Sequence, residues 1–275
     1  MIRTYDPELL ELEEELGGQL HDQQLRYQFL HEFESPETAD YFVVRLGRTP
    51  EGHERLTRDA ATGFPGISAS DLTALIAGVR RVDVGKGPMD FIPAMTNQFK
   101  ASQQRRHALR KELCQPLSSA LIEFRQHLAL LHAKALSAIL RGYRRQALEW
   151  VGEALHLIQD SYSPAHVERL WRGSGGRHPI VYIRYFGLRG RPYPLEHRVF
   201  PPPDPRDIVT GTGGLLTRAA RQAVSASREY LHLVLRHFST PRSPRISAQL
   251  HAFMNKHLVL SPRRIEPRHY YPRCP

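Results

Sequence analysis

Residues 116–140, PLSSALIEFRQHLALLHAKALSAIL, place apolar side chains at helical spacing behind Pro116, a residue that a first helical turn tolerates well. Residues 143–162, YRRQALEWVGEALHLIQDSY, repeat the pattern and stop just before Ser163-Pro164. Together they predict two long helices joined by a short turn. The chain is therefore expected to be all-α, a helical bundle.

Weaker patterns outside this pair predict further elements. A helix is expected at residues 70–81, with Asp71 as N-cap candidate, after the turn-rich residues 46–66. The Gly- and Pro-rich residues 171–208 hold one β-like run, PIVYIRYF at 179–186. The remaining expected helices are residues 7–33, 100–113, 213–238 and 246–260.

These patterns divide the chain into three parts. Residues 1–45 are expected to form an acidic N-terminal helical arm. Residues 46–262 would form the helical domain, with the long irregular loop as an insertion on its active side. Residues 263–275 are a basic, Pro-rich tail that is expected to be extended.

The composition indicates where the protein is made and which metal ligands it could use. No apolar run is long enough to span a membrane, and the acidic N-terminus has no apolar signal region. We therefore expect a protein that is cytoplasmic as synthesised, with secretion by a signal-independent route as an alternative. The two cysteines, Cys114 and Cys274, have no CxxC partner, so neither a thiolate zinc site nor a disulfide framework is indicated. A metal site would use nitrogen and oxygen ligands, for which the fifteen histidines are a ready source.

The charge is unevenly distributed. The whole chain carries +10, but residues 1–40 hold eleven acidic and two basic residues, which leaves +19 on the rest. A basic body favours anionic partners, namely phosphate esters, nucleic acid or an anionic membrane surface. The alternative is an ordinary solvated surface rich in arginine.

The candidate functional residues lie at the end of the second long helix, in the sequence ALHLIQDSYSPAHVERL. His156 and Asp160 are four positions apart, so a helix places them on one face. Pro164 ends the helix, and His166 follows where the turning chain can return to the same pocket. The alternative is a buried His–Asp hydrogen bond followed by a surface histidine.

The longer string H-x3-D-x5-H, with Pro164 two residues before the last histidine, resembles the zinc-binding core of the phospholipase C / P1 nuclease superfamily. The resemblance extends in chain order over roughly residues 50–240. It includes an early histidine that opens the first helix, an aspartate after the first helical hairpin, a histidine on the next helix and a late histidine. The positions that match these are His53, Asp83, His107 and His197.

The resemblance implies an all-α phosphodiesterase with two or three zinc ions per chain. Asp83, His107, His156 and Asp160 would hold one zinc, and Asp160 would bridge to a second zinc bound by His53. His166 and His197 would hold the third. Asp83 and Asp160 would be the catalytic carboxylates, with Asp83 orienting the nucleophile or taking its proton.

The sequence departs from the superfamily pattern in two ways. Position 201 is Pro where a glutamate ligand is expected, so Glu196, Asp204 or Asp207 would have to supply that oxygen. The secreted members use an amino-terminal Trp as a ligand, but no Trp precedes Trp150 here.

Three functions follow from these observations. The first is a phospholipase C-like enzyme of lipid degradation that cleaves glycerophospholipids, with loop aromatics meeting the lipid (Tyr182, Tyr185, Phe186, Tyr193 and Phe200). The second is a P1-like single-strand nuclease or nucleotidase, in which the same aromatics stack on bases. The third is a non-enzymatic helical metal-binding protein. Histidines outside the motif are interpreted as packing residues (His127 and His132) or as surface or structural residues (His178, His232, His237 and His251).

Overall fold

The structure is a computed structural model that describes residues 52–84, 101–171, 178–187, 197–198, 209 and 215–274, with backbone only at 83–84, 101–102, 186–187 and 197–198. Most of the described residues are helical, as the sequence predicts. The expected arm at 1–45 lies outside the described residues. None of the described helices is long and apolar enough to cross a membrane.

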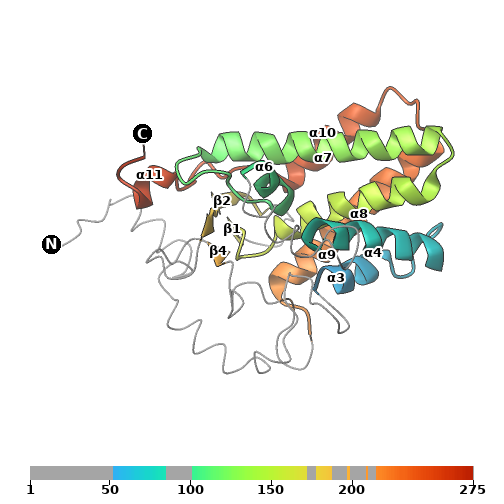
Figure 1. The fold of residues 1–275 in the computed structure, drawn as a ribbon, viewed down its shortest axis with the longest axis horizontal. Coiled ribbons are helices and arrows are strands. Elements are labelled where there is room, and N and C mark those ends of the chain that lie inside the picture. The colour runs from blue at the N-terminus through green and yellow to red at the C-terminus, as the bar shows by residue number, and fades with distance from the viewer. Residues whose placement is uncertain are drawn as a thin grey trace.

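Two long helices form the centre of the fold, as predicted. They are α7 (Leu117–Leu140) and α8 (Arg144–Asp160), joined by a tight turn in which Gly142 has a positive φ of 80°. Helix α8 contacts α7 on one side and α4 (Ala69–Val84) on another, and it also packs against α9 (Arg218–Ser239) and α3 (Gly52–Ala61). Figure 1 shows this layered arrangement, with α7 above α8 and with α3 and α4 below it. Every α8 residue from Val151 to Asp160 is consequently buried.

The α4–α8 contact is unusually close. A Cβ placed on Gly152 would lie 2.9 Å from the Cα of Gly78, so the two helices meet backbone to backbone. Helix α4 begins earlier than predicted because Ser68 is its cap: the Ser68 amide donates to Asp71 (3.0 Å) and the Asp71 amide donates to the Ser68 hydroxyl (3.1 Å). Asp71 therefore belongs to the first turn of the helix and is not its N-cap.

The predicted basic helix at 100–113 is wrong as a continuous element. The chain forms a short helix α6 (Ala101–Gln104) and a 3-10 turn η2 (Arg105–His107), and then Ala108 adopts a left-handed conformation with φ 49°. A left-handed residue ends a helix, so the chain leaves the helical path directly after His107. Helices α9 and α10 (Ile246–His257) occupy the two other predicted segments, with Thr217 capping α9.

A small β structure lies beside the helices. Strand β1 (Val167–Arg169) pairs antiparallel with β2 (Ile180–Ile183), which lies in the predicted β-like run. A second pair, β3 (Phe186–Gly187) and β4 (His197–Arg198), is parallel. The β1–β2 pair places the chain that follows α8 against the core.

The C-terminal tail is not extended throughout, in contrast to the prediction. Its backbone runs along β2, where the Ser261 amide donates to the Ile180 carbonyl (2.7 Å) and the Ile265 amide to that of Val181 (2.9 Å). A short helix, α11 (Pro267–Tyr270), follows. Cys274 then forms a disulfide with Cys114, although the spacing of the two cysteines in the sequence indicates no disulfide framework. The pairing depends on the path of the tail along β2, which returns Cys274 to the start of α7.

Candidate metal centre

Four segments bring five of the predicted ligands together. His156 and Asp160 stand one turn apart on the buried end of α8. His53 is the second residue of α3, and His107 is the last residue of η2. His166 follows a turn in which the amides of His166 and Val167 both donate to the Ser163 carbonyl (3.0 and 2.8 Å). This turn brings the chain back past the end of α8, as predicted from Pro164.

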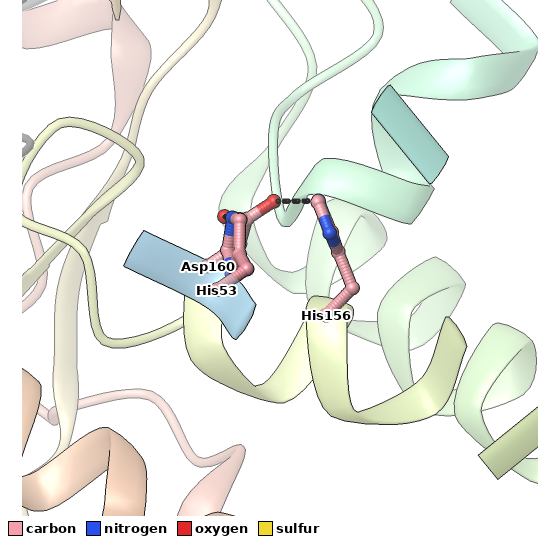
Figure 2. A group of neighbouring side chains, drawn as sticks. All are labelled: His53, His156 and Asp160. Atoms are coloured by element: carbon pink, nitrogen blue, oxygen red, sulfur yellow. Dashed lines mark ion pairs between the residues drawn. The ribbon is translucent and has the colours of Figure 1, made fainter. Parts of the chain in front are cut away.

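Asp160 is at the centre of the group. Its Oδ1 lies 3.1 Å from Nε2 of His53, and its Oδ2 lies 3.0 Å from Nε2 of His156. The Oδ2 atom is also 3.4 Å from Nδ1 of His107 and 3.7 Å from Nδ1 of His166. Figure 2 shows His156 and Asp160 on successive turns of α8, next to His53 of α3. One carboxylate is therefore surrounded by four imidazole rings.

His166 is fixed by the backbone of its neighbour. Its Nδ1 lies 2.5 Å from the His107 carbonyl oxygen, and a carbonyl can only accept a hydrogen bond. The Nδ1 atom therefore carries the proton, and the lone pair of the neutral ring is on Nε2. A metal would have to bind His166 through Nε2.

The cluster is buried. His53, His156 and Asp160 have no exposed surface, and His107 and His166 are also buried. Burial alone would raise the pKa of Asp160. The nearby imidazoles of His166, His156 and His53 instead hold the pKa of this carboxyl well below its usual range. Asp160 is therefore an anion inside the protein core.

This arrangement suits a cation. Nε2 of His53 and Nε2 of His156 lie 3.1 and 3.0 Å from the two oxygens of Asp160, and His107 also interacts with this carboxylate. A buried anion needs hydrogen bonds, a charged partner or a metal to offset its lost hydration. One ligand atom from each of His53, His156 and Asp160 lies within 4.8 Å of the other two, so this group could hold a metal ion.

The other two predicted ligands are placed by backbone only. Asp83 lies in the last turn of α4, not after the helix, and its side chain is outside the described residues. His197 begins β4 and pairs with Phe186 of β3. The alternative oxygen ligands Glu196, Asp204 and Asp207 also lie outside the described residues.

A second layer of polar side chains, absent from the sequence prediction, lies behind His53. Its Nδ1 is 2.8 Å from Oε1 of Gln159, whose Nε2 is 3.0 Å from the Thr57 hydroxyl and 3.5 Å from the Ser227 hydroxyl. The sequence held only the positions of these residues as an indication of this layer. Gln159 directly precedes Asp160, and Thr57 lies one helical turn after His53. A polar residue in a buried helical stretch needs a partner, but the sequence does not say which one.

The positions of the remaining histidines are compatible with their interpretation as packing, surface or structural residues. His132 is a packing residue, as predicted, and it bonds to Tyr230 (3.2 Å) and His237 (2.9 Å). Burial lowers the pKa of His127 to about 3. His237 and His178 are buried, and His232 and His251 are exposed.

Tyr182 cannot make the contact with a lipid or a nucleic-acid base that was predicted for the aromatic residues of the loop. Tyr182 is fully buried in β2, where its hydroxyl accepts a hydrogen bond from Arg110 (2.7 Å) and its ring packs edge-on to Tyr270. It therefore belongs to the core and meets neither a lipid surface nor a base. Tyr185 is partly exposed, the side chain of Phe186 is not described, and Tyr193 and Phe200 lie outside the described residues.

The fold and the cluster define a class: a mainly helical protein with a buried histidine–carboxylate centre that could hold a metal ion. Comparison with known proteins adds no relative, because no protein-family model, no curated protein and no solved structure matches the chain.

Proposed function

We propose that this chain is a zinc-dependent phosphodiester hydrolase. The observation that carries the proposal is the fully buried Asp160 carboxylate with four imidazole rings around it. Imidazole nitrogens gathered around one carboxylate are the ligand types that zinc takes in proteins.

The donor set favours zinc among the available ions. Imidazole nitrogens combined with a carboxylate oxygen suit zinc, and they also accommodate manganese and iron. Calcium and magnesium prefer oxygen ligands, which this group provides from Asp160 alone among the described side chains of the cluster. The disulfide between Cys114 and Cys274 leaves no thiolate for a softer ion.

The residues of this chain would fix the geometry of the centre. Helix α8 holds His156 and Asp160 in rigid register, and α3 brings His53 to the opposite oxygen of the carboxylate. Arg110 clamps the loop after His107 to the carbonyl of Ile183 (2.6 Å). When bound, zinc lowers the pKa of water and polarises phosphoryl oxygens.

The substrate class follows from charge and from the superfamily resemblance. A body with a charge of +19 outside residues 1–40 suits a phosphodiester anion. A glycerophospholipid, cleaved in the manner of phospholipase C, is the first substrate to test. Single-stranded nucleic acid shares the phosphodiester group and is the alternative.

The experiment combines metal content with hydrolysis. Protein purified without chelator is analysed for zinc and assayed with phosphatidylcholine vesicles and single-stranded DNA, for wild type and Asp160→Asn. The variant keeps the size of the side chain but removes the charge that would balance the metal. We expect at least two zinc ions per wild-type chain, less zinc in the variant, and hydrolysis lowered by several orders of magnitude. Asp59→Asn, on the partly exposed face of α3, is the matched control and should behave as wild type.

The outcomes separate the three functions. Hydrolysis of lipid or of DNA identifies the substrate class. Zinc binding with no hydrolysis of either would favour a non-enzymatic metal-binding protein. Full zinc content and full activity in Asp160→Asn would show that the cluster is a structural hydrogen-bond group.

A further inference from the structure

Gln159 joins three helices directly behind the metal centre. It is fully buried on α8, and its amide contacts His53 and Thr57 of α3 and Ser227 of α9, all of which are also fully buried. Because these side chains are fully buried, each of their polar atoms needs a hydrogen-bond partner. The Gln159 amide is therefore held by contacts at both of its ends.

The amide can set the proton of His53. Its Oε1 faces Nδ1 of His53 at 2.8 Å, and a carbonyl oxygen only accepts. Its Nε2 faces the hydroxyls of Thr57 and Ser227, which can accept from it. In this arrangement Nδ1 of His53 carries a proton and the lone pair of the neutral ring is on Nε2, the atom 3.1 Å from Asp160 Oδ1.

We infer that Gln159 is a positioning residue for the metal centre: it fixes the ring orientation and the Nδ1–H tautomer of His53, so that Nε2 is presented for metal binding. The inference rests on the proposed role of His53 as a ligand. Outer partners of this kind typically contribute 10- to 100-fold to metal affinity. Thr57 and Ser227 act one step further out, by holding the amide.

The test uses the full chain with zinc as the probe. Gln159→Met fills the same space without an acceptor for His53, and Gln159→Glu keeps the acceptor but loses the amide donor. Zinc affinity is measured by competition with a chromophoric chelator. We expect an affinity about 10- to 100-fold weaker in Gln159→Met and recovery to within about threefold of wild type in Gln159→Glu. Asp59→Asn, on the partly exposed face of α3 and outside this group of contacts, is the control and should stay within about threefold of wild type.

A second measurement does not depend on metal or on the folding of a variant. In the 15N-labelled wild-type protein without metal, the ring nitrogen signals of His53 report which atoms carry protons. In the neutral ring, a proton on Nδ1 supports the inference, and a proton on Nε2 overturns it. Zinc affinity of Gln159→Met within twofold of wild type also overturns it. A wild-type chain that binds no zinc contradicts the proposed function, and the position of the His53 proton still decides the role of Gln159.

Discussion

Gly78 and Gly152 bring α4 and α8 into backbone contact, since a Cβ on Gly152 would lie 2.9 Å from the Cα of Gly78. Real Cβ atoms do not approach a neighbouring backbone so closely, and the neighbour here is a helix, not the end of a flexible side chain. The register of α8, and with it the placement of His156 and Asp160, therefore depends on having glycine, which has no Cβ, at this contact.

Gly152→Ala should destabilise the protein. Alanine favours a helix by about 1 kcal/mol over glycine, but overpacking of a close contact costs about 1–3 kcal/mol or more, and here the clash is with backbone. We expect a net loss of about 1–2 kcal/mol in the free energy of unfolding, measured by urea denaturation. Ser119→Ala, on the exposed side of α7, should change it by less than about 0.5 kcal/mol. A Gly152→Ala protein as stable as wild type would show that α4 and α8 are less closely packed.

His156→Ala should weaken zinc binding more than His166→Ala. The Nε2 atom of His156 is 3.0 Å from Asp160 and shares one group with it and His53, whereas His166 turns its Nδ1 to a backbone carbonyl. We expect a loss of about 100-fold or more for His156→Ala, beyond the range of an outer partner, and a smaller loss for His166→Ala. Chelator competition measures both, with the exposed His251→Ala as control. Equal, negligible losses would contradict the assignment of His156 as a ligand.

Acid should destabilise the fold through His132. Burial, with a smaller effect of His237, lowers the pKa of His132 from 6.5 to about 4. The unfolded chain therefore binds a proton at a higher pH than the native protein does. The contribution of neutral His132 to stability is complete above about pH 6.5 and is lost as pH falls toward 4, by about 1.4 kcal/mol per pH unit.

The slope of unfolding free energy against pH tests this. His132→Gln should show a shallower slope between pH 6.5 and 4, by roughly the contribution of one proton. His232→Gln, exposed on α9, should keep the wild-type slope. The same slope in His132→Gln and wild type would mean that His132 does not titrate differently in the two states.

Arg169→Met should be among the most damaging substitutions away from the candidate metal centre. The buried guanidinium donates to the carbonyls of Ser161 (2.6 Å), His178 (2.6 Å) and His257 (2.9 Å), and thus joins the end of α8 to two later segments. Methionine fills the space but leaves these acceptors buried without their donor, which costs about 1–3 kcal/mol for each group.

Thermal unfolding measures the loss of stability in Arg169→Met. The variant Arg169→Lys tests whether this loss comes from the geometry of the guanidinium group. Arg169→Lys keeps the charge but cannot reproduce the planar fork, so it should also be destabilised. Arg236→Met, on the exposed side of α9, should be near wild type. Full rescue by lysine would contradict the role of the guanidinium geometry.

The sequence predicted those features that depend on local periodicity. Helices α7 and α8 agree with the prediction within a few residues, because their apolar spacing and the flanking Pro116 and Pro164 are local signals. The grouping of His156, Asp160 and His166 was also predictable, since a helical turn followed by a proline break fixes their separation.

The remaining features depend on contacts between distant segments. The end of the 100–113 segment is set by the left-handed Ala108 and by Arg110, which bonds to the carbonyl of Ile183 in β2, so local helix propensity is overridden. Gln159 gains its role only because α3 and α9 bring Thr57 and Ser227 to it. The Cys114–Cys274 disulfide likewise depends on the fold of the chain between two residues that are 160 positions apart.

That disulfide also closes a covalent ring of chain. His156, Asp160 and His166 lie inside the ring of chain that it closes, and His53 and His107 lie outside it. A protease that cuts once between Cys114 and Cys274 therefore opens the ring without separating the two fragments. The nicked molecule would keep its full mass on a gel until a reductant is added, and all five cluster residues would remain covalently joined.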